Sequence, residues 1–223
     1  MKNKVLSIGL FLVLFGSLSN ASALQFTFDN ITNNDPFNAA TGEAQLFMDV
    51  DLLGSQVMFT FTNKGDEASS ICDIYFDDDV PLLNFVSFSY FTSGVSFTVG
   101  ARPGNLPGGK DPLYAFSSDY DYDSASPVQP EGINPGESMG ILFDFSTIRT
   151  GGGTYTFNDL LASLDSGAFR VGIHVQGFAN GGSESFITTQ TTETNPVPEP
   201  ATLLLFGIGL IGLAKVGKKR FLA

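Results

Sequence analysis

The chain has no tryptophan, one cysteine and one histidine among its 223 residues. With Cys72 alone, a disulfide within the chain is excluded, so stability must come from a hydrophobic core. Cys72 lies in the apolar stretch Ile71–Phe76, which predicts a buried and inert thiol. His174 has no second histidine with which to form a zinc site. We therefore expect His174 to be a hydrogen-bonded structural residue rather than a catalytic one.

Basic residues are also scarce in the body of the chain. Residues 24–200 contain five basic and 23 acidic residues, which leaves a net charge of −18. This balance argues against a nucleic-acid partner, because contacts with phosphates need Lys and Arg. It permits cation binding and solubility outside the cell, although a solvated acidic surface is the simpler explanation.

The N-terminus has the pattern of a secretory signal peptide. Lys2 and Lys4 precede an apolar stretch from Val5 to Leu18, and the small residues Ala21 and Ala23 then form a signal-peptidase site. We expect export by the Sec machinery, removal of residues 1–23 and a mature protein that begins with residue 24. The alternative is an uncleaved N-terminal anchor, which the short apolar stretch and the cleavage pattern disfavour.

The C-terminus has three parts in a fixed order. Pro198, Glu199 and Pro200 precede an apolar run of 14 residues, Ala201–Ala214. A helix of that length spans about 21 Å, against about 30 Å for the hydrocarbon core of a bilayer. Lysine side chains that reach back to the interface extend such a span, so we predict a C-terminal transmembrane helix. Basic residues favour the cytoplasmic side, which would leave the tail in the cytoplasm and the domain outside. The basic residues that follow the run are Lys215, Lys218, Lys219 and Arg220.

This arrangement over residues 198–223 resembles the PEP-CTERM sorting signal of Gram-negative bacteria. The resemblance implies that a membrane-embedded, exosortase-like protease or transpeptidase recognises the Pro-Glu-Pro motif and processes the tail. It also implies transient anchoring in the inner membrane, followed by display on the cell surface or secretion. Because exopolysaccharide genes usually accompany such proteins, it further implies an association with extracellular polysaccharide or biofilm. Arg170–Phe178 and Gly181–Phe186 resemble a segment found upstream of that signal.

Alternating apolar residues and frequent turn residues predict an all-β domain over residues 24–187. We expect an antiparallel β-sandwich, with a jelly-roll as one arrangement, followed by a Thr/Pro linker over 188–197. Asn158–Asp165 is predicted as a short helix, capped by Asn158 and ended by Gly167. The predicted strands are Ala44–Asp51 and Gln56–Thr62 (a hairpin), Ile71–Phe76, Leu82–Tyr90, Val95–Val99, Met139–Phe145, Phe169–Phe178 and an edge strand Ser185–Thr188.

Residues 102–136 contain six prolines and are predicted to be a long loop with one short strand at Tyr114–Phe116. Within it, Asp119, Asp121 and Asp123 alternate with tyrosines. Such carboxylates can bind Ca²⁺, while stacking of the tyrosine rings on sugars is an alternative. A solvated acidic loop is the competing explanation, and Asp77–Asp79 forms a second acidic cluster.

Ser138 lies in Gly136–Gly140, which matches the G-x-S-x-G motif of hydrolases. The motif requires a strand before the serine and a helix after it, whereas here prolines precede Ser138 and a strand-like stretch follows. We therefore predict a turn that opens a strand, and a protein that is not an enzyme and needs no cofactor. The expected function is that of an exported surface or matrix protein. A carbohydrate- or calcium-binding module is the alternative, and a secreted hydrolase, such as one using paired carboxylates on glycosides, is the weaker one.

Overall fold

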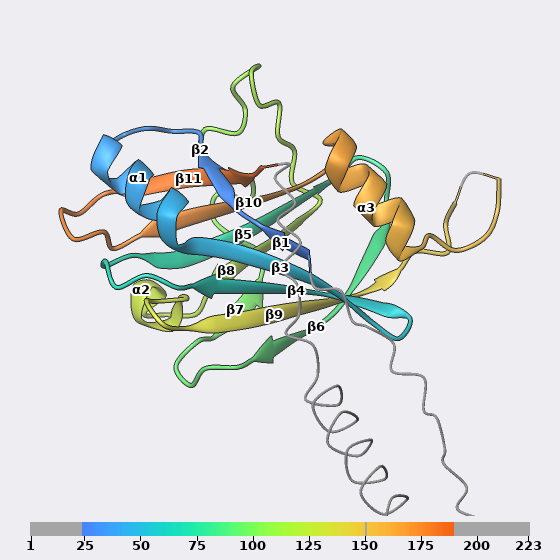
Figure 1. Cartoon of the computed structure of the whole chain (residues 1–223), viewed down its shortest axis with the longest axis horizontal. Helices are drawn as coiled ribbons and strands as arrows, with labels where there is room; N and C mark the ends of the chain where they lie inside the picture. The colour runs from blue at the N-terminus through green and yellow to red at the C-terminus, as the bar shows by residue number, and fades with distance from the viewer. Residues whose placement is uncertain (1–23, 150, 190–223) are drawn as a thin grey trace, which may run out of the picture.

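The computed structural model describes residues 24–149 and 151–189, which form two antiparallel β-sheets with three helices (Figure 1). The predicted signal peptide (1–23) and sorting tail (198–223) lie outside these residues. In the described part of the chain, no helix is long and apolar enough to cross a membrane.

Sheet A has five strands in the order β1-β3-β4-β9-β6, and sheet B has six in the order β2-β11-β10-β5-β8-β7. Every strand pairing is antiparallel, which confirms the predicted all-β class. The jelly-roll arrangement stays a prediction. The strands of sheet A are β1 (Leu24–Phe26), β3 (Leu46–Leu53), β4 (Gln56–Asn63), β6 (Leu83–Tyr90) and β9 (Ser138–Phe145). Those of sheet B are β2 (Phe28–Asn30), β5 (Ser70–Asp78), β7 (Phe97–Val99), β8 (Tyr120–Ser124), β10 (Phe169–Gln176) and β11 (Ser183–Thr188).

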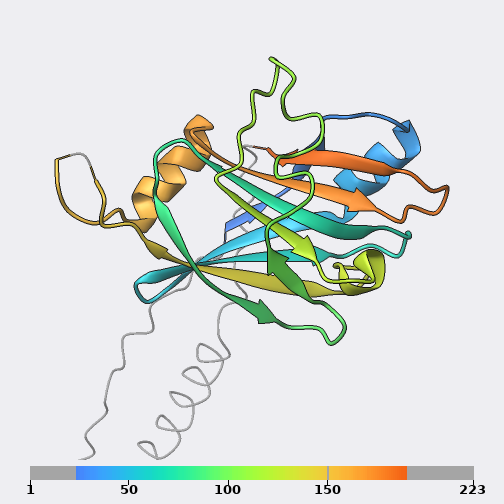
Figure 2. The same cartoon turned by 180° about the vertical axis from the view of Figure 1, so that it is seen from behind.

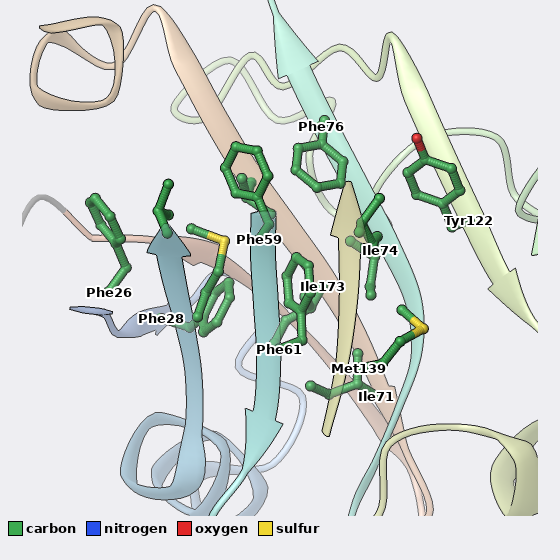
Figure 3. Close-up of a cluster of buried hydrophobic side chains, with 14 of the residues drawn as sticks. Phe26, Phe28, Phe59, Phe61, Ile71, Ile74, Phe76, Tyr122, Met139 and Ile173 are labelled. Atoms are coloured by element: carbon green, nitrogen blue, oxygen red, sulfur yellow. The ribbon is translucent and has the colours of Figure 1, made fainter. Parts of the chain in front are cut away.

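Phenylalanine rings fill the space between the two sheets (Figure 3). Phe59 of β4 lies 5.2 Å from Phe76 of β5, 5.6 Å from Phe143 of β9 and 5.8 Å from Phe169 of β10, between ring centroids. Full burial of each such side chain contributes about 1.5–3 kcal/mol, and each ring pair adds about 0.5–1.5 kcal/mol. This aromatic layer holds the sandwich together without any disulfide.

The helices lie at opposite ends of the sandwich (Figure 1). Helices α1 (Pro36–Gln45) and α2 (Val128–Glu131) lie at one end, and α3 (Phe157–Ser166) lies at the other, which we call the α3 end. The predicted Asn158–Asp165 helix is therefore confirmed, but its cap is Thr156. The Thr156 hydroxyl accepts from the N–H of Asp159, and the Asp159 carboxylate accepts from the N–H of Thr156. Gly167 ends the helix in the left-handed conformation, as predicted.

Besides the helix cap, two local predictions were wrong. Tyr114–Phe116 lie in a turn and the loop after it rather than in a strand, because the N–H groups of Tyr114 and Ala115 both donate to Asp111 O. The strand of this region is β8, at the alternating tyrosines and aspartates. Strand β11 is not an edge strand, because β2 pairs with its outer side.

The two ends of the described chain lie together. The backbone N–H of Thr189 donates to Thr27 O at 3.1 Å, and the two threonine hydroxyls are 2.8 Å apart. Thr27 is also where the first strand crosses from sheet A to sheet B. The predicted linker 188–197 was set one residue too early, because Thr188 is the last residue of β11, and most of the linker lies outside the described residues.

Candidate functional site

The outer face of sheet B carries a line of polar side chains across four adjacent strands. In the strand register, Ser185 of β11 lies opposite His174 of β10, His174 opposite Asp73 of β5, and Asp73 opposite Asp123 of β8. Residues directly opposite one another project on the same face of a sheet. We call Ser185, His174, Asp73 and Asp123 the polar row.

A short hydrogen bond lies at the centre of the polar row. His174 Nδ1 is 2.8 Å from Asp73 Oδ2, and the Asp73 residue is only 3% exposed. Burial raises the pKa of Asp123, the neighbouring Asp73 carboxylate raises it further, and Arg102 opposes this. The arrangement agrees with the prediction that His174 is a hydrogen-bonded residue of the sheet, sharing its face with Gly172 and Gln176.

A second polar contact joins sheet B to the long loop between β7 and β8. The Arg170 guanidinium pairs with the Asp77 carboxylate and donates to the backbone oxygens of Tyr114 and Ala115. The Asp77 carboxylate also accepts a hydrogen bond from the backbone N–H of Ser117, at 3.1 Å. Burial raises the pKa of Asp77, while the Ser117 N–H and Arg170 oppose the rise.

The same loop, residues 101–118, packs over the outer face of sheet B (Figure 2). Leu106 and Phe116 are buried against Tyr75 and Ile187, which makes a small second core outside the sandwich. Gly172 permits this close packing, because a Cβ there would lie 2.7 Å from Leu106 Cδ2. A shallow recess of about 400 Å³ lies in the loop, lined by Pro103–Gly108 and Lys110.

The three predicted calcium ligands do not converge. Asp121 and Asp123 lie on β8 and Asp119 just before it, so neighbouring carboxylates leave the strand about 6.6 Å apart. Asp119 accepts from the N–H of Asp78 at 2.8 Å, Asp121 from the N–H of Ala101, and Asp123 lies beside Asp73. Within residues 24–149 and 151–189, no three acidic, histidine or cysteine side chains are placed to hold a metal ion. Calcium binding by these residues stays a prediction.

Ser138 and His174 lie in different sheets, Ser138 at the start of β9 and His174 in β10. Gly136, at φ +82°, forms the turn that opens β9, as predicted. Cys72 is fully buried, and burial raises the pKa of its thiol to about 11, which agrees with the inert role expected.

Beyond the described domain, comparison with known families locates the sorting signal. Residues 196–220 match the family model of the PEP-CTERM protein-sorting motif. No curated protein and no solved structure matches the chain.

The PEP-CTERM motif indicates an exported protein that is sorted by exosortase, a membrane enzyme. It also implies a C-terminal membrane anchor before processing. Pro198, Glu199 and Pro200, together with Lys215, Lys218, Lys219 and Arg220, all fall inside the matched residues. The motif describes delivery of the protein, and leaves the role of the β domain open.

Four polar residues of sheet B were not singled out from the sequence: Asp73, Arg170, Glu184 and Ser185. Burial opposes ionisation of Glu184, but hydrogen bonds from Thr32, Asn30 and the N–H groups of Asn34 and Asp35 lower its pKa. Arg170, Glu184 and Ser185 belong to the two stretches that resembled a segment upstream of PEP-CTERM signals. That resemblance was the available signal in the sequence, because the two stretches form the β10–β11 hairpin. In this hairpin Arg170, His174 and Glu184 each bond to a different part of the chain.

Proposed function

We propose that this protein is an exported, non-catalytic surface or extracellular-matrix protein whose β domain associates with extracellular polysaccharide. The PEP-CTERM match at residues 196–220, directly after the β domain, carries the proposal. In this scheme the Sec machinery exports the chain, signal peptidase cuts after Ala23, and an exosortase then processes the anchored tail. The destination is the surface or the surroundings of a Gram-negative cell.

Two features of the domain support this assignment. The contacts between Thr27 and Thr189 bring the two ends of the domain together, so the leader and the sorting tail join it at one place. The net charge of −18 over residues 24–200 also favours solubility in a crowded exterior.

Sorting is tested by the intact mass of the protein recovered from the cell envelope and from the medium. We expect a species that starts at Leu24 and ends near residues 198–201. Glu199→Gln should leave export intact but leave the tail uncut. Glu193→Gln is the matched control, because it makes the same change six residues upstream, outside the matched motif. Normal processing of the Glu199→Gln chain would contradict the assignment.

A second candidate function is a carbohydrate- or calcium-binding module that uses residues 102–136. The observation that favours it is the recess lined by Pro103–Gly108 and Lys110, which lies in a loop fixed to the sheet by Arg170. A ligand that binds only the folded protein raises its melting temperature. An unchanged melting temperature with Ca²⁺ and with a panel of glycans would rule this function out.

A further inference from the structure

Two exposed leucines break the alternation of β3 at its end. Leu46, Met48 and Val50 point into the core, but Leu52 and Leu53 are consecutive and both exposed, by 42% and 48%. They lead into the tight turn at Gly54 and Ser55 that connects β3 to β4. We call Leu52 and Leu53 the apolar tip. Polar residues would satisfy the same turn, so the turn itself does not explain two leucines.

More apolar side chains lie at the same α3 end of the sandwich. Leu52 lines a recess of about 430 Å³ together with the half-buried rings of Phe145, Tyr155 and Phe157. Ile148, 76% exposed, follows β9 at this end. Exposed aliphatic residues beside aromatic rings are typical of surfaces that contact a partner or a membrane.

Both ends of the domain point toward this end. Strand β1 begins at Leu24, opposite Val50, which is three residues or about 10 Å from Leu53. Strand β11 runs antiparallel to β10, which starts next to α3, so β11 approaches the α3 end as it reaches Thr188. The described chain therefore ends, at Thr189, after a strand that runs toward the end of the apolar tip.

The length of chain beyond the domain keeps the domain close to the bilayer. Eight residues separate Thr189 from Pro198, and fully extended they span no more than about 30 Å. While the tail is anchored, the domain is confined to this distance from the membrane. Under such confinement even a weak contact is populated, because the effective concentration of the surface is high.

We propose that the apolar tip rests in the headgroup region of the bilayer while the uncut chain is anchored. The inference relies on the anchored stage of the proposed function and adds an orientation to it: the α3 end faces the membrane and the α1 end faces away. The charges near the tip indicate the lipid. Asp79, Asp144 and Asp159 outnumber Arg149 at this end, and the excess negative charge repels anionic lipids, so zwitterionic lipids suit the surface better. This orientation would hold the start of the linker beside a membrane enzyme.

The test uses the full uncut chain, reconstituted in phosphatidylcholine vesicles that contain a lipid-borne quencher. An environment-sensitive fluorophore is attached at Ser55→Cys, next to the tip, or at Ser93→Cys, an exposed residue beyond the far end of β6. Cys72 needs no removal, since its thiol is fully buried. We expect several-fold stronger quenching at position 55 than at position 93. Equal quenching at the two positions would overturn the proposal.

The second comparison separates the tip from its surroundings. Leu52→Ser with Leu53→Ser should reduce quenching at position 55 to the level of position 93. Because nearly half of each side chain is already exposed, the melting temperature should fall only slightly. Unchanged quenching in that variant would also overturn the proposal. The proposal would also be overturned if the quenching disappeared at a lower ratio of protein to lipid, because a contact between two copies of the chain would then explain it. Tail processing does not enter this experiment, so failure of the sorting assignment would be seen separately, in the masses.

Discussion

The outer faces of the two sheets differ in how they meet the solvent. On sheet A, outer residues of β4 and β9 such as Thr60, Thr62 and Asp144 are at least partly exposed, although Met58 and Gly140 on the same face are buried. On sheet B the loop 101–118 covers part of the outer face, and all nine residues of β5 are buried. Sheet A is therefore partly solvent-exposed on its outer face, whereas the central strand β5 of sheet B is buried on both faces.

This difference decides which polar groups matter for stability. Asp77 and Asp73 of β5 are charged groups inside the protein, and each has one cationic or titratable partner, Arg170 or His174. A buried charge that loses its partner is costly, whereas an exposed ion pair contributes little. We therefore expect sheet B to depend on its polar contacts far more than sheet A does.

The largest effect should come from Arg170→Met. This change leaves the buried Asp77 carboxylate without its partner and releases the loop from sheet B, and we expect a loss of about 3 kcal/mol in the free energy of unfolding. The loss should be larger at pH 8 than at pH 5, because burial already raises the pKa of Asp77 and removal of Arg170 lets it protonate at higher pH. Denaturant unfolding at the two pH values measures both quantities.

Arg149→Met is the matched control for this prediction. Arg149 pairs with Asp159 at 3.1 Å on the surface, where solvent screens the interaction. This variant should unfold at nearly the wild-type denaturant concentration. If the two arginine variants lose equal stability, the coverage of sheet B by the loop does not have the energetic role that we assign to it.

The next effect concerns Asp78, at the α3 end of β5. Burial raises its pKa to about 7, and Asp119 and Asp77 raise it too, although the N–H groups of Leu82 and Leu83 donate to the carboxylate. In the unfolded chain the carboxyl has its ordinary pKa near 3.8. Between these two values the folded state binds more protons, so stability should fall as pH rises from about 4 to about 7.

Asp78→Asn tests this pH dependence. The amide oxygen can still accept from Leu82 and Leu83, and no charge is buried, so we expect a gain of about 2 kcal/mol at pH 8 and little change at pH 4. Asp79→Asn, the next residue and exposed, is the control. Equal pH dependence in wild type and in Asp78→Asn would show that another group is responsible.

The same contrast explains what could be predicted from the sequence. Strands β3, β4 and β9 alternate apolar and polar residues because one face of sheet A is solvated, so their positions were predicted to within about two residues. Strand β8 also alternates, but the prolines around it suggested a loop. The sequence does not show that the chain before β8, residues 101–118, covers a sheet. Helix α1 was missed, although its Asp35 cap and Pro36 at its first turn are a helix start signal.

The candidate site was harder to predict than the fold. The polar row joins four strands that are far apart in the sequence, and only strand order and register bring Asp73 next to His174, 101 residues away. Asp121 was noticed because it is close in sequence to other acids, yet its partner is the N–H of Ala101. The sorting motif, in contrast, is contiguous, so the sequence alone was sufficient to recognise it.

The smallest effect is expected on the open face of sheet A. Lys64 Nζ lies 4.6 Å from the centroid of the Phe47 ring, where a solvent-exposed cation–π contact contributes about 0.5 kcal/mol. Lys64→Met keeps the aliphatic stem and removes the charge, so it should lower the free energy of unfolding by about that amount. Lys110→Met, an exposed lysine of the loop over sheet B, is the control and should change it less.

A loss above about 1.5 kcal/mol for Lys64→Met would mean that the outer face of sheet A is as dependent on its charges as sheet B, since such a value is outside the range of exposed contacts. A small loss would have a further use. It would show that this face tolerates substitution, and a face that is not needed for stability is free to carry the contacts of a surface or matrix protein. Substitutions there could then be screened for loss of the proposed polysaccharide association without unfolding the domain.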